Sequence, residues 1–348
     1  MSAHRPVGID QIGRFDAIID ARSPSEFAED HLPGAINCPV LDDEERRIVG
    51  TLYKQQGAFV ARRLGGAMVA ANLSRHLREH FSGHPEKWRP LVYCWRGGMR
   101  SGSMVTWMRL VGWDAQQLAG GYKRFRRHVI DDLAERVPGL NLRVISGPTG
   151  SAKSWLLRLL AEAGAQVLDL EGLAVHKGSV LGGMPGRPQP SQKAFETALW
   201  SGLRGLDPAR PVFVEAESRR IGKLHLPTPL LDRMRASPCL EVSAPLAARL
   251  DYLLRDYAYL GDDRAALAQR LGQLQGLHPN ETLQRWQAWA REGALAPLFE
   301  ALMVTHYDPA YARSQGSHYA QVGQAERLEL AQLDEASLRA LAQRLAAG

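Results

Sequence analysis

Cysteine is scarce in this sequence. Among 348 residues there are three cysteines, Cys38, Cys94 and Cys239, at scattered positions. Such a set cannot form the framework of a disulfide-stabilised domain, and a working thiolate would require a reducing compartment. The chain also lacks any run of eighteen or more apolar residues, and its first residues lack the apolar core of a signal peptide. These absences predict a cytoplasmic protein that does not associate with membranes.

A strong excess of one charge is also missing. The chain has 43 Lys and Arg against 37 Asp and Glu, a net charge of +6, so the placement of the basic residues matters more than their number. Residues 123–128 are the densest basic run, which either binds the phosphates of a nucleic acid or lies on a solvated helix face. The candidates for nucleic-acid contact in this run are Lys123, Arg124, Arg126 and Arg127.

Metal-ligand spacing and internal repeats are missing too, so we expect neither a His, Cys or Asp metal site nor a repeat protein. The chain instead alternates strand and helix signals. Residues 1–125 predict a small α/β domain with a mainly parallel sheet, and residues 126–140 predict a connecting helix that breaks at Pro138-Gly139. Residues 141–348 predict a second α/β domain whose C-terminal part is helical.

One of the three cysteines lies in an unusual loop. An apolar run, Leu91-Val-Tyr, leads to Cys94, and residues 101–111 have helical spacing, so Cys94 is expected where a strand gives way to a helix. Loop amides and a helix N-terminus both favour a thiolate over a thiol, and Arg96 and Arg100 add positive charge. Cys38 and Cys239 have no basic neighbours and are interpreted as buried, inert thiols. Cys94 is therefore the candidate nucleophile, with Arg96 and Arg100 as its partners.

A second glycine-rich loop follows the strand signal at residues 142–146. Its sequence, Gly147-Pro-Thr-Gly-Ser-Ala-Lys-Ser154, matches the phosphate-binding pattern G-x-x-x-x-G-K-[ST] except at Ala152, where a glycine is expected. Lys153 can still reach a terminal phosphate, and Ser154 can still ligate Mg²⁺. The candidate phosphate-binding residues of this loop are Gly147, Thr149, Gly150, Ser151, Lys153 and Ser154.

Acidic and basic side chains follow another strand signal, Val212-Phe-Val214. Glu215 and Glu217 could hold water and a metal ion, although their alternation suggests that they point to different faces. Arg219 and Arg220 could clamp a diphosphate, or could form surface ion pairs with the two glutamates. Further along the chain, His306 and Asp308 are weak candidates for substrate contact.

The stretch from Asp20 to Asn37, Asp-Ala-Arg-Ser-Pro-Ser-Glu-Phe followed by His31-Leu-Pro-Gly-Ala-Ile-Asn, resembles the entry motif of rhodanese domains. A rhodanese domain followed directly by a P-loop domain resembles the bacterial tRNA 2-selenouridine synthases over the whole chain. Further matches to this family are residues 49–57, 120–123, 215–222 and 306–309. The resemblance implies an N-terminal rhodanese-like domain and a C-terminal P-loop NTPase-like α/β domain.

The same resemblance implies a transferase that acts on the wobble 2-thiouridine of tRNAs for Lys, Glu and Gln. Geranyl diphosphate would alkylate the sulfur, and selenium from selenophosphate would then displace the S-geranyl group, with Cys94 as the selenium carrier. Both compounds would be substrates, so no tightly bound cofactor is expected beyond potential Mg²⁺ at Ser154. The tRNA would be the partner, along with a potential enzyme that supplies selenophosphate.

Two alternatives stay open at this point. Cys94 and Arg100 also satisfy C-x5-R, the pattern with which protein phosphatases hold a phosphate over a thiolate, although the sequence marks no general acid. We interpret the five intervening residues as room for selenophosphate. The other alternative is a sulfurtransferase or regulatory first domain joined to a P-loop domain that uses ATP. Neither alternative explains why Ala152 is tolerated.

Overall fold

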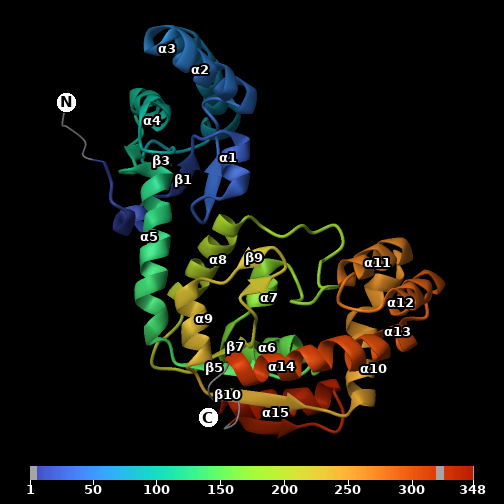
Figure 1. Cartoon of the computed structure of the whole chain (residues 1–348). Coiled ribbons are helices and arrows are strands. Elements are labelled where there is room, and N and C mark those ends of the chain that lie inside the picture. Colours follow the sequence, from blue (N-terminus) through green and yellow to red (C-terminus); the bar gives the residue numbers. More distant parts are fainter. Residues whose placement is uncertain (1–5, 319–324, 348) are drawn as a thin grey trace. The chain divides into compact units, whose positions relative to one another are not determined.

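A computed structural model describes residues 6–318 and 325–347 of the chain. The chain divides into two compact units, Met1–Asp132 and Leu133–Gly348. Each unit is built on its own parallel sheet, which confirms the two α/β folds expected from the sequence (Figure 1). None of the described helices combines the length and the apolar character that crossing a membrane requires.

The first unit holds a four-stranded sheet in the order β2-β1-β3-β4, and every neighbouring pair of strands is parallel. The strands are β1 (Ala17–Asp20), β2 (Ala35–Asn37), β3 (Pro90–Tyr93) and β4 (Gln116–Gln117). Its helical elements are η1 (Ile9–Arg14), α1 (Pro24–Glu29), α2 (Asp43–Gln56), α3 (Ala58–His76), η2 (Leu77–Phe81), α4 (Met99–Val111) and the first turns of α5 (Gly121–Arg136). The central strand β3 is fully buried, as its continuous apolar sequence requires.

The second unit holds a five-stranded parallel sheet in the order β11-β10-β5-β7-β6. Its strands are β5 (Leu142–Ser146), β6 (Gln166–Leu168), β7 (Val212–Glu215), β10 (Cys239–Ser243) and β11 (Glu326–Glu329), and a separate hairpin pairs β8 (Arg220–Ile221) with β9 (Leu224–His225). The helices that accompany the sheet are α6 (Lys153–Glu162), α7 (Leu170–Ala174), α8 (Gln192–Arg204), α9 (Thr228–Arg235) and α15 (Glu335–Ala346). Apolar side chains of α6 and α15 pack together with those of the strands in one core.

Helices dominate the second unit after Pro245, as the sequence predicts. They are α10 (Leu246–Asp256), η4 (Ala258–Gly261), α11 (Arg264–Leu271), η5 (Gly272–Leu274), α12 (Asn280–Glu292), α13 (Leu295–Leu302), η6 (Met303–Tyr307) and α14 (Asp308–His318). They share a second apolar core centred on the fully buried Trp286. In Figure 1 α11, α12 and α13 form a group of their own at the end of α10.

The segment expected to link the domains differs in detail from the prediction. A single helix, α5, begins already at Gly121 and ends at Arg136, and a short turn, η3 (Val137–Gly139), contains the predicted break at Pro138. The basic run 123–128 therefore belongs to the first turns of this helix. The boundary between the two units falls within α5, after Asp132.

Candidate active sites

The Cys94 loop has the geometry of an anion-stabilising site. Cys94 follows β3 directly, and α4 begins at Met99, two residues earlier than the sequence predicts. Its Sγ accepts a hydrogen bond from the Gly98 amide at 3.3 Å and another from Ser101 Oγ at 3.1 Å. Cys94 is only 3% exposed. Two hydrogen-bond donors at the start of a helix therefore contact its sulfur.

The segment 120–123, which contains Gly120 and Gly121, contacts the backbone of the Cys94 loop. The amides of Tyr122 and Lys123 donate to the carbonyl oxygens of Cys94 and Trp95, each at 2.9 Å. Gly121 has a φ of +56°, and a Cβ placed on it would collide with the carbonyl oxygen of Cys94 and with the amide of Gly97. The segment 120–123 therefore fixes the backbone of the Cys94 loop, which accounts for its glycines.

A buried arginine explains the motif that begins at Asp20. Arg22 is 1% exposed, and its guanidinium contacts the Asp20 carboxylate at 2.6 Å and the Asp30 carbonyl at 2.7 Å. Its Cζ lies 4.0 Å from the centre of the Tyr122 ring, whose hydroxyl donates to Asp30 at 2.7 Å. The network ties the first loop of the domain to the start of α5, and so positions the Cys94 loop indirectly.

The arginines around Cys94 are arranged differently from the expectation. Arg100 donates to the carboxylate of Glu26 at 2.6 Å, and Arg46 donates to the same carboxylate at 2.9 Å. Burial opposes ionisation of Glu26, but the hydrogen bond and charge of Arg100 outweigh it and lower the pKa of this carboxyl. Arg96 is exposed. Arg100 is thus paired with Glu26 and is not free beside Cys94. Glu26 lies in the rhodanese-like motif, but it was not among the residues selected from the sequence.

The other two cysteines are poor nucleophiles. Burial, reinforced by Asp20, raises the pKa of Cys38 to about 12. Burial and then the charge of Glu241 raise the pKa of Cys239. Both thiols are neutral near pH 7, and this agrees with their interpretation as inert side chains.

The candidate nucleic-acid residues of α5 are only partly available. Lys123, Arg124 and Arg127 are exposed, whereas Arg126 is half-buried. Burial lowers the pKa of Arg126, against the opposing charge of Asp30. Three of the four residues can therefore contact a phosphate on the surface.

In the second unit, the loop between β5 and α6 adopts a phosphate-binding conformation. Gly147 and Gly150 have φ values of +149° and +85°, and Ala152 has a φ of +59° in the left-handed region. Ala152 thus adopts the conformation for which the motif normally uses glycine, and its methyl group is buried in the core below. Lys153 Nζ donates to the Gly147 carbonyl at 2.9 Å, which holds the amine across the loop. Alanine in place of glycine at residue 152 therefore adds a methyl group and leaves the backbone conformation of the phosphate loop in place.

Three carboxylates meet beside this loop, contrary to the expectation that Glu215 and Glu217 diverge. One oxygen from each of Glu171, Glu215 and Glu217 lies within 4.8 Å of the others. Ser154 Oγ lies 2.9 Å from a Glu171 oxygen and 3.2 Å from a Glu215 oxygen. Glu215 is 1% exposed, and its Oε1 has no hydrogen-bond partner among the described residues. These oxygens form a donor set suited to a hard divalent cation. The sequence had named Ser154, Glu215 and Glu217 as candidate ligands, but not Glu171.

Glu171 is the member of this cluster that sequence reasoning missed. It lies in α7, just after β6, so its position at the end of a parallel strand was the available signal. Burial, and then the charge of Asp169, raise its pKa to about 7 against the opposing Ser154 and Lys153. Burial and the charge of Glu171 raise the pKa of Glu217 to about 8 and that of Glu215 well above its usual value.

Arg219 and Arg220 do not take the positions expected of a diphosphate clamp. Both are exposed at the β8 turn, and Arg220 donates to the Gly222 carbonyl at 3.3 Å. Neither is among the residues that line the cavity of about 250 Å³ above the phosphate loop. The cationic side chains that do line it are Lys153 and Lys177.

Asp308 supports the phosphate loop and does not face the cavity. It pairs with the guanidinium of Arg249 through two hydrogen bonds of 2.9 and 2.8 Å, and Arg249 also donates to the Thr149 carbonyl at 3.0 Å. The neighbouring His306 forms a 3.0 Å hydrogen bond with His278. Asp308 therefore positions Thr149 through Arg249.

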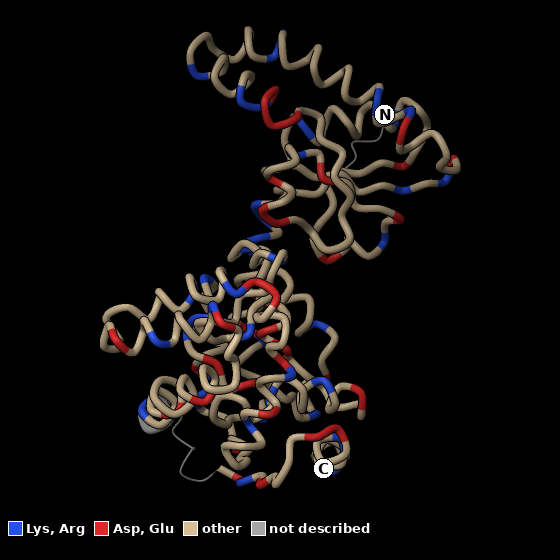
Figure 2. Tube along the Cα trace, turned by 90° about the vertical axis from the view of Figure 1, so that its right-hand side faces the viewer, with Lys and Arg blue, Asp and Glu red and all other residues tan. Residues whose placement is uncertain are grey.

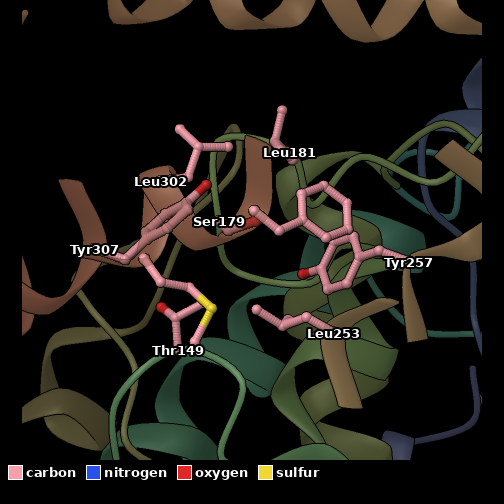
Figure 3. Close-up of a pocket in the computed structure, with 9 residues that line it drawn as sticks. Thr149, Ser179, Leu181, Leu253, Tyr257, Leu302 and Tyr307 are labelled. Atoms are coloured by element: carbon pink, nitrogen blue, oxygen red, sulfur yellow. The ribbon is translucent and has the colours of Figure 1, made fainter. Parts of the chain in front are cut away.

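A second, narrow cavity of about 20 Å³, which has room for about one water molecule, adjoins the phosphate loop. Thr149, Ser179, Leu253, Tyr257 and Tyr307 line both cavities. In Figure 3 Tyr257 and Tyr307 lie on opposite sides of it and Thr149 lies at the loop below. The remaining lining residues are apolar: Leu181, Phe299, Leu302 and Met303. A phosphate cradle thus shares its wall with an apolar chamber, an arrangement that suits a phosphate ester with an apolar tail.

Comparison with known proteins agrees with both units. The family described as a rhodanese-like domain matches residues 9–128, and the family described as the tRNA 2-selenouridine synthase AAA domain matches residues 140–288. The chain is 42% identical over 247 residues to the tRNA 2-selenouridine synthase of Nitrosomonas europaea, a match that covers 69% of this chain and 63% of that protein.

Longer matches are found with other relatives of the same name. The chain is 34% identical to the protein of Alcanivorax borkumensis, over 84% of this chain and 88% of that protein. It is also 34% identical to the protein of Cupriavidus pinatubonensis, over 88% and 90% of the respective chains. The match to some relatives, including that of Nitrosomonas europaea, spans less than two thirds of their length. On the strength of the long matches and of both domains, the chain belongs to the family of tRNA 2-selenouridine synthases.

Proposed function

We propose that this protein is a tRNA 2-selenouridine synthase that exchanges the sulfur of a wobble 2-thiouridine for selenium in two steps. The phosphate-loop unit would transfer a geranyl group from geranyl diphosphate to the sulfur. The Cys94 unit would then deliver selenium that originates from selenophosphate. An enzyme with these substrates is a transferase that acts on tRNA in the cytoplasm, and it would depend on an enzyme that makes selenophosphate.

The observation that supports the first step is the narrow apolar cavity that shares Thr149 and Tyr257 with the cavity above the phosphate loop. Leu302, Met303 and Phe299 offer no hydrogen-bond partner to the polar edge of a nucleobase or to a ribose. A ten-carbon prenyl chain needs no such partner, and if these side chains move apart to admit it, its burial is favourable by about 25 cal/mol per Å². The pair of cavities therefore favours geranyl diphosphate over ATP.

In the alkylation step the uridine sulfur forms a bond to C1 of the geranyl group while the bond from C1 to the diphosphate oxygen breaks. The leaving diphosphate gains negative charge. Lys153 and the amides of residues 147–154 lie where they would stabilise that charge. Ser154, Glu171, Glu215 and Glu217 would hold a Mg²⁺ ion, which when bound neutralises charge on the leaving group.

In the selenation step the bond between C2 of the uridine and the S-geranyl sulfur breaks as a C2–Se bond forms, and geranyl thiol leaves. An S-alkyl group leaves far more readily than the sulfur of a thiocarbonyl, which gives the first step its purpose. Because the selenium of selenophosphate is at the selenide level, it would be loaded by attack on the Cys94 sulfur of a mixed disulfide: the S–Se bond forms, the small thiol leaves, and water takes the phosphoryl group as phosphate. Cys94 would then present the selenium as a selenylsulfide, stabilised by the donors Gly98 and Ser101. A thiol would then release the product by taking the Cys94 sulfur into a mixed disulfide.

The role of Arg100 follows from the same geometry. A phosphate group of selenophosphate would have to compete with the Glu26 carboxylate for this guanidinium. A phosphatase of the C-x5-R type faces the same competition. If the purified protein releases phosphate from aryl phosphates and leaves selenophosphate unconsumed, the phosphatase alternative replaces this proposal.

Mass spectrometry of tRNA nucleosides separates the two steps. We expect Cys94→Ser to accumulate S-geranyl-2-thiouridine and Lys153→Ala to leave 2-thiouridine unchanged, while the control Cys239→Ser behaves as wild type. Normal selenation by Cys94→Ser would remove the proposed role of Cys94. Geranylation that requires ATP, or that survives in Lys153→Ala, would remove the role of the phosphate loop.

A further inference from the structure

The first unit carries a helical hairpin, α2 and α3, whose charge is unusually one-sided. The two helices meet at Gly57, which has a φ of +90°. Residues 46–78 contain seven Lys and Arg and no Asp or Glu. Because the net charge of the whole chain is +6, these residues more than account for its basic excess. The segment 49–57, which matches the family but has no part in either site, lies at the end of α2.

The tip of this hairpin exposes two aromatic rings among cations. Tyr53 is 60% and Phe59 76% exposed. Lys54, Arg62 and Arg63 are also exposed, and no ion pair is recorded for them in the part of the chain that the structure describes. In Figure 2 the red, acidic segment of the hairpin lies at its base, and blue segments lie towards its tip. Two apolar rings and three unpaired cations thus share one exposed tip.

These exposed side chains do not hold the hairpin together. The helices pack through small and buried residues: a Cβ on Gly65 would contact the Val49 side chain at 3.1 Å. At the base, the Asn72 amide donates to the Val40 carbonyl at 3.2 Å and to Glu45 at 2.6 Å. Tyr53 and Phe59 therefore leave apolar surface in water although the packing of the hairpin does not require it. Such exposed rings point to an external ligand.

The base of the hairpin is joined to the Cys94 loop by one carboxylate. Glu26 accepts from Arg46 of α2 at 2.9 Å and from Arg100 of α4 at 2.6 Å. A ligand held along the hairpin is therefore carried on an element that is connected directly to the selenium site within the same unit.

We propose that the tip of the α2–α3 hairpin binds the tRNA substrate, with Lys54, Arg62 and Arg63 on its phosphates and with Tyr53 and Phe59 stacked on unpaired bases. The identity of the RNA rests on the proposed function. Single-stranded loops of RNA are bound in this way, since unpaired bases stack on aromatic rings beside cations that contact the backbone. The tip has cations and no carboxylates, so it attracts a polyanion such as RNA and would repel a basic partner.

Two double variants test the surface: Arg62→Glu with Arg63→Glu, and Tyr53→Ala with Phe59→Ala. The matched control is Arg285→Glu with Arg291→Glu, two exposed arginines of α12 that give the same change in net charge. Binding of an unmodified tRNA substrate would be measured by fluorescence anisotropy over a series of salt concentrations. Circular dichroism and light scattering would check the fold and the oligomeric state of each variant.

We expect the charge-reversal variant to bind at least about tenfold more weakly and with a smaller salt dependence, since phosphate contacts are lost. The aromatic variant should lose about tenfold in affinity with its salt dependence unchanged, because stacking is not ionic. The control should stay within about twofold of wild type.

Wild-type affinity in both hairpin variants would overturn the inference and leave the proposed function intact. Failure of the wild-type protein to bind or modify tRNA would remove the proposed function itself. If the hairpin variants change the oligomeric state and leave RNA affinity unchanged, the tip is a contact between copies of the chain and the inference is wrong. Loss of binding to anionic lipid vesicles with unchanged RNA binding would identify a membrane surface instead.

Discussion

At the scale of single residues, the carboxylate cluster of the second unit is costly unless something neutralises it. Glu215 is almost completely buried, and Glu171 and Glu217 lie close to it. Burial, and then the charge of Asp169, raise the pKa of Glu171 to about 7. Burial, and then the charge of Glu171, raise that of Glu217 to about 8. The cluster therefore retains protons near neutral pH, or exchanges them for a divalent cation.

This cluster predicts a pH dependence of stability that a cation removes. Because the folded pKa values lie above the unfolded value of 4.5, the folded state binds the extra protons. The stability that these protons contribute is fully present below the unfolded pKa of 4.5 and is lost as the pH rises through the folded values of about 7 and 8. Stability should therefore fall between about pH 4.5 and about pH 8. We expect Mg²⁺ to raise the melting temperature at about pH 8.5 and to have little effect at about pH 5.5.

Thermal melts with Mg²⁺ or with EDTA at the two pH values would check this expectation. Glu217→Gln should flatten the pH dependence and weaken the effect of Mg²⁺, whereas the control Glu292→Gln, an exposed residue of α12, should change neither. A melting temperature that does not respond to Mg²⁺ at the higher pH would argue against a cation at this cluster.

Residue-scale features were predictable from the sequence where a local motif determines them. The phosphate loop was recognised from its spacing, but the effect of Ala152 was not, because a sequence does not reveal that its φ would be +59°. Glu171 was missed because it comes from a strand end that is distant in sequence. Arg100 was expected to be free for an anion, and its pairing with Glu26 depends on a contact between residues 74 positions apart.

At the scale of elements, the segment 120–123 acts as a support for the Cys94 loop. Gly121→Ala would place a methyl group against the Cys94 carbonyl at a residue with a φ of +56°. We expect this change to lower the free energy of unfolding by about 2 kcal/mol or more and to slow selenation of preformed S-geranyl tRNA. Geranylation should persist, because the phosphate loop lies in the other unit.

The matched control is Gly139→Ala, since a Cβ there meets no atom within 4 Å and the backbone needs no left-handed conformation. Chemical denaturation would give the stability of each variant, and nucleoside analysis would give the two activities. Equal selenation by Gly121→Ala and by wild type would show that the Cys94 loop does not need this support.

Elements were predictable where burial imposes one pattern. The parallel strands β3 and β7 are buried throughout, and their apolar runs identified them. In β5 and β10 a single charged residue interrupts the apolar sequence, and the runs could still be recognised. The hairpin of α2 and α3 was not foreseen. The apolar residues of α3 fall on all sides of the helix, and its sequence contains two adjacent glycines. No amphipathic stripe therefore predicts a helix there.

At the scale of the whole molecule, the proposal assigns its two chemical steps to separate compact units, Met1–Asp132 and Leu133–Gly348. The sequence predicted this division because each unit has its own strand and helix alternation and its own glycine-rich loop. It expected a connecting helix over residues 126–140, and the division falls within that helix, α5, which begins earlier, at Gly121. Local patterns did not show that this helix begins within the first unit.

Separate sites predict that two inactive variants complement each other. Lys153→Ala should retain the Cys94 chemistry, and Cys94→Ser should retain geranylation, so neither variant alone makes 2-selenouridine from 2-thiouridine. A mixture should make it, because S-geranyl tRNA released by one variant is the substrate of the other. Nucleoside mass spectrometry of the mixture, with each variant alone at the same total concentration, measures the recovery. Recovery that falls when excess unlabelled S-geranyl tRNA dilutes a labelled intermediate would establish transfer through solution. No recovery, with each single step intact, would mean that the uridine passes between the two sites of one chain without release.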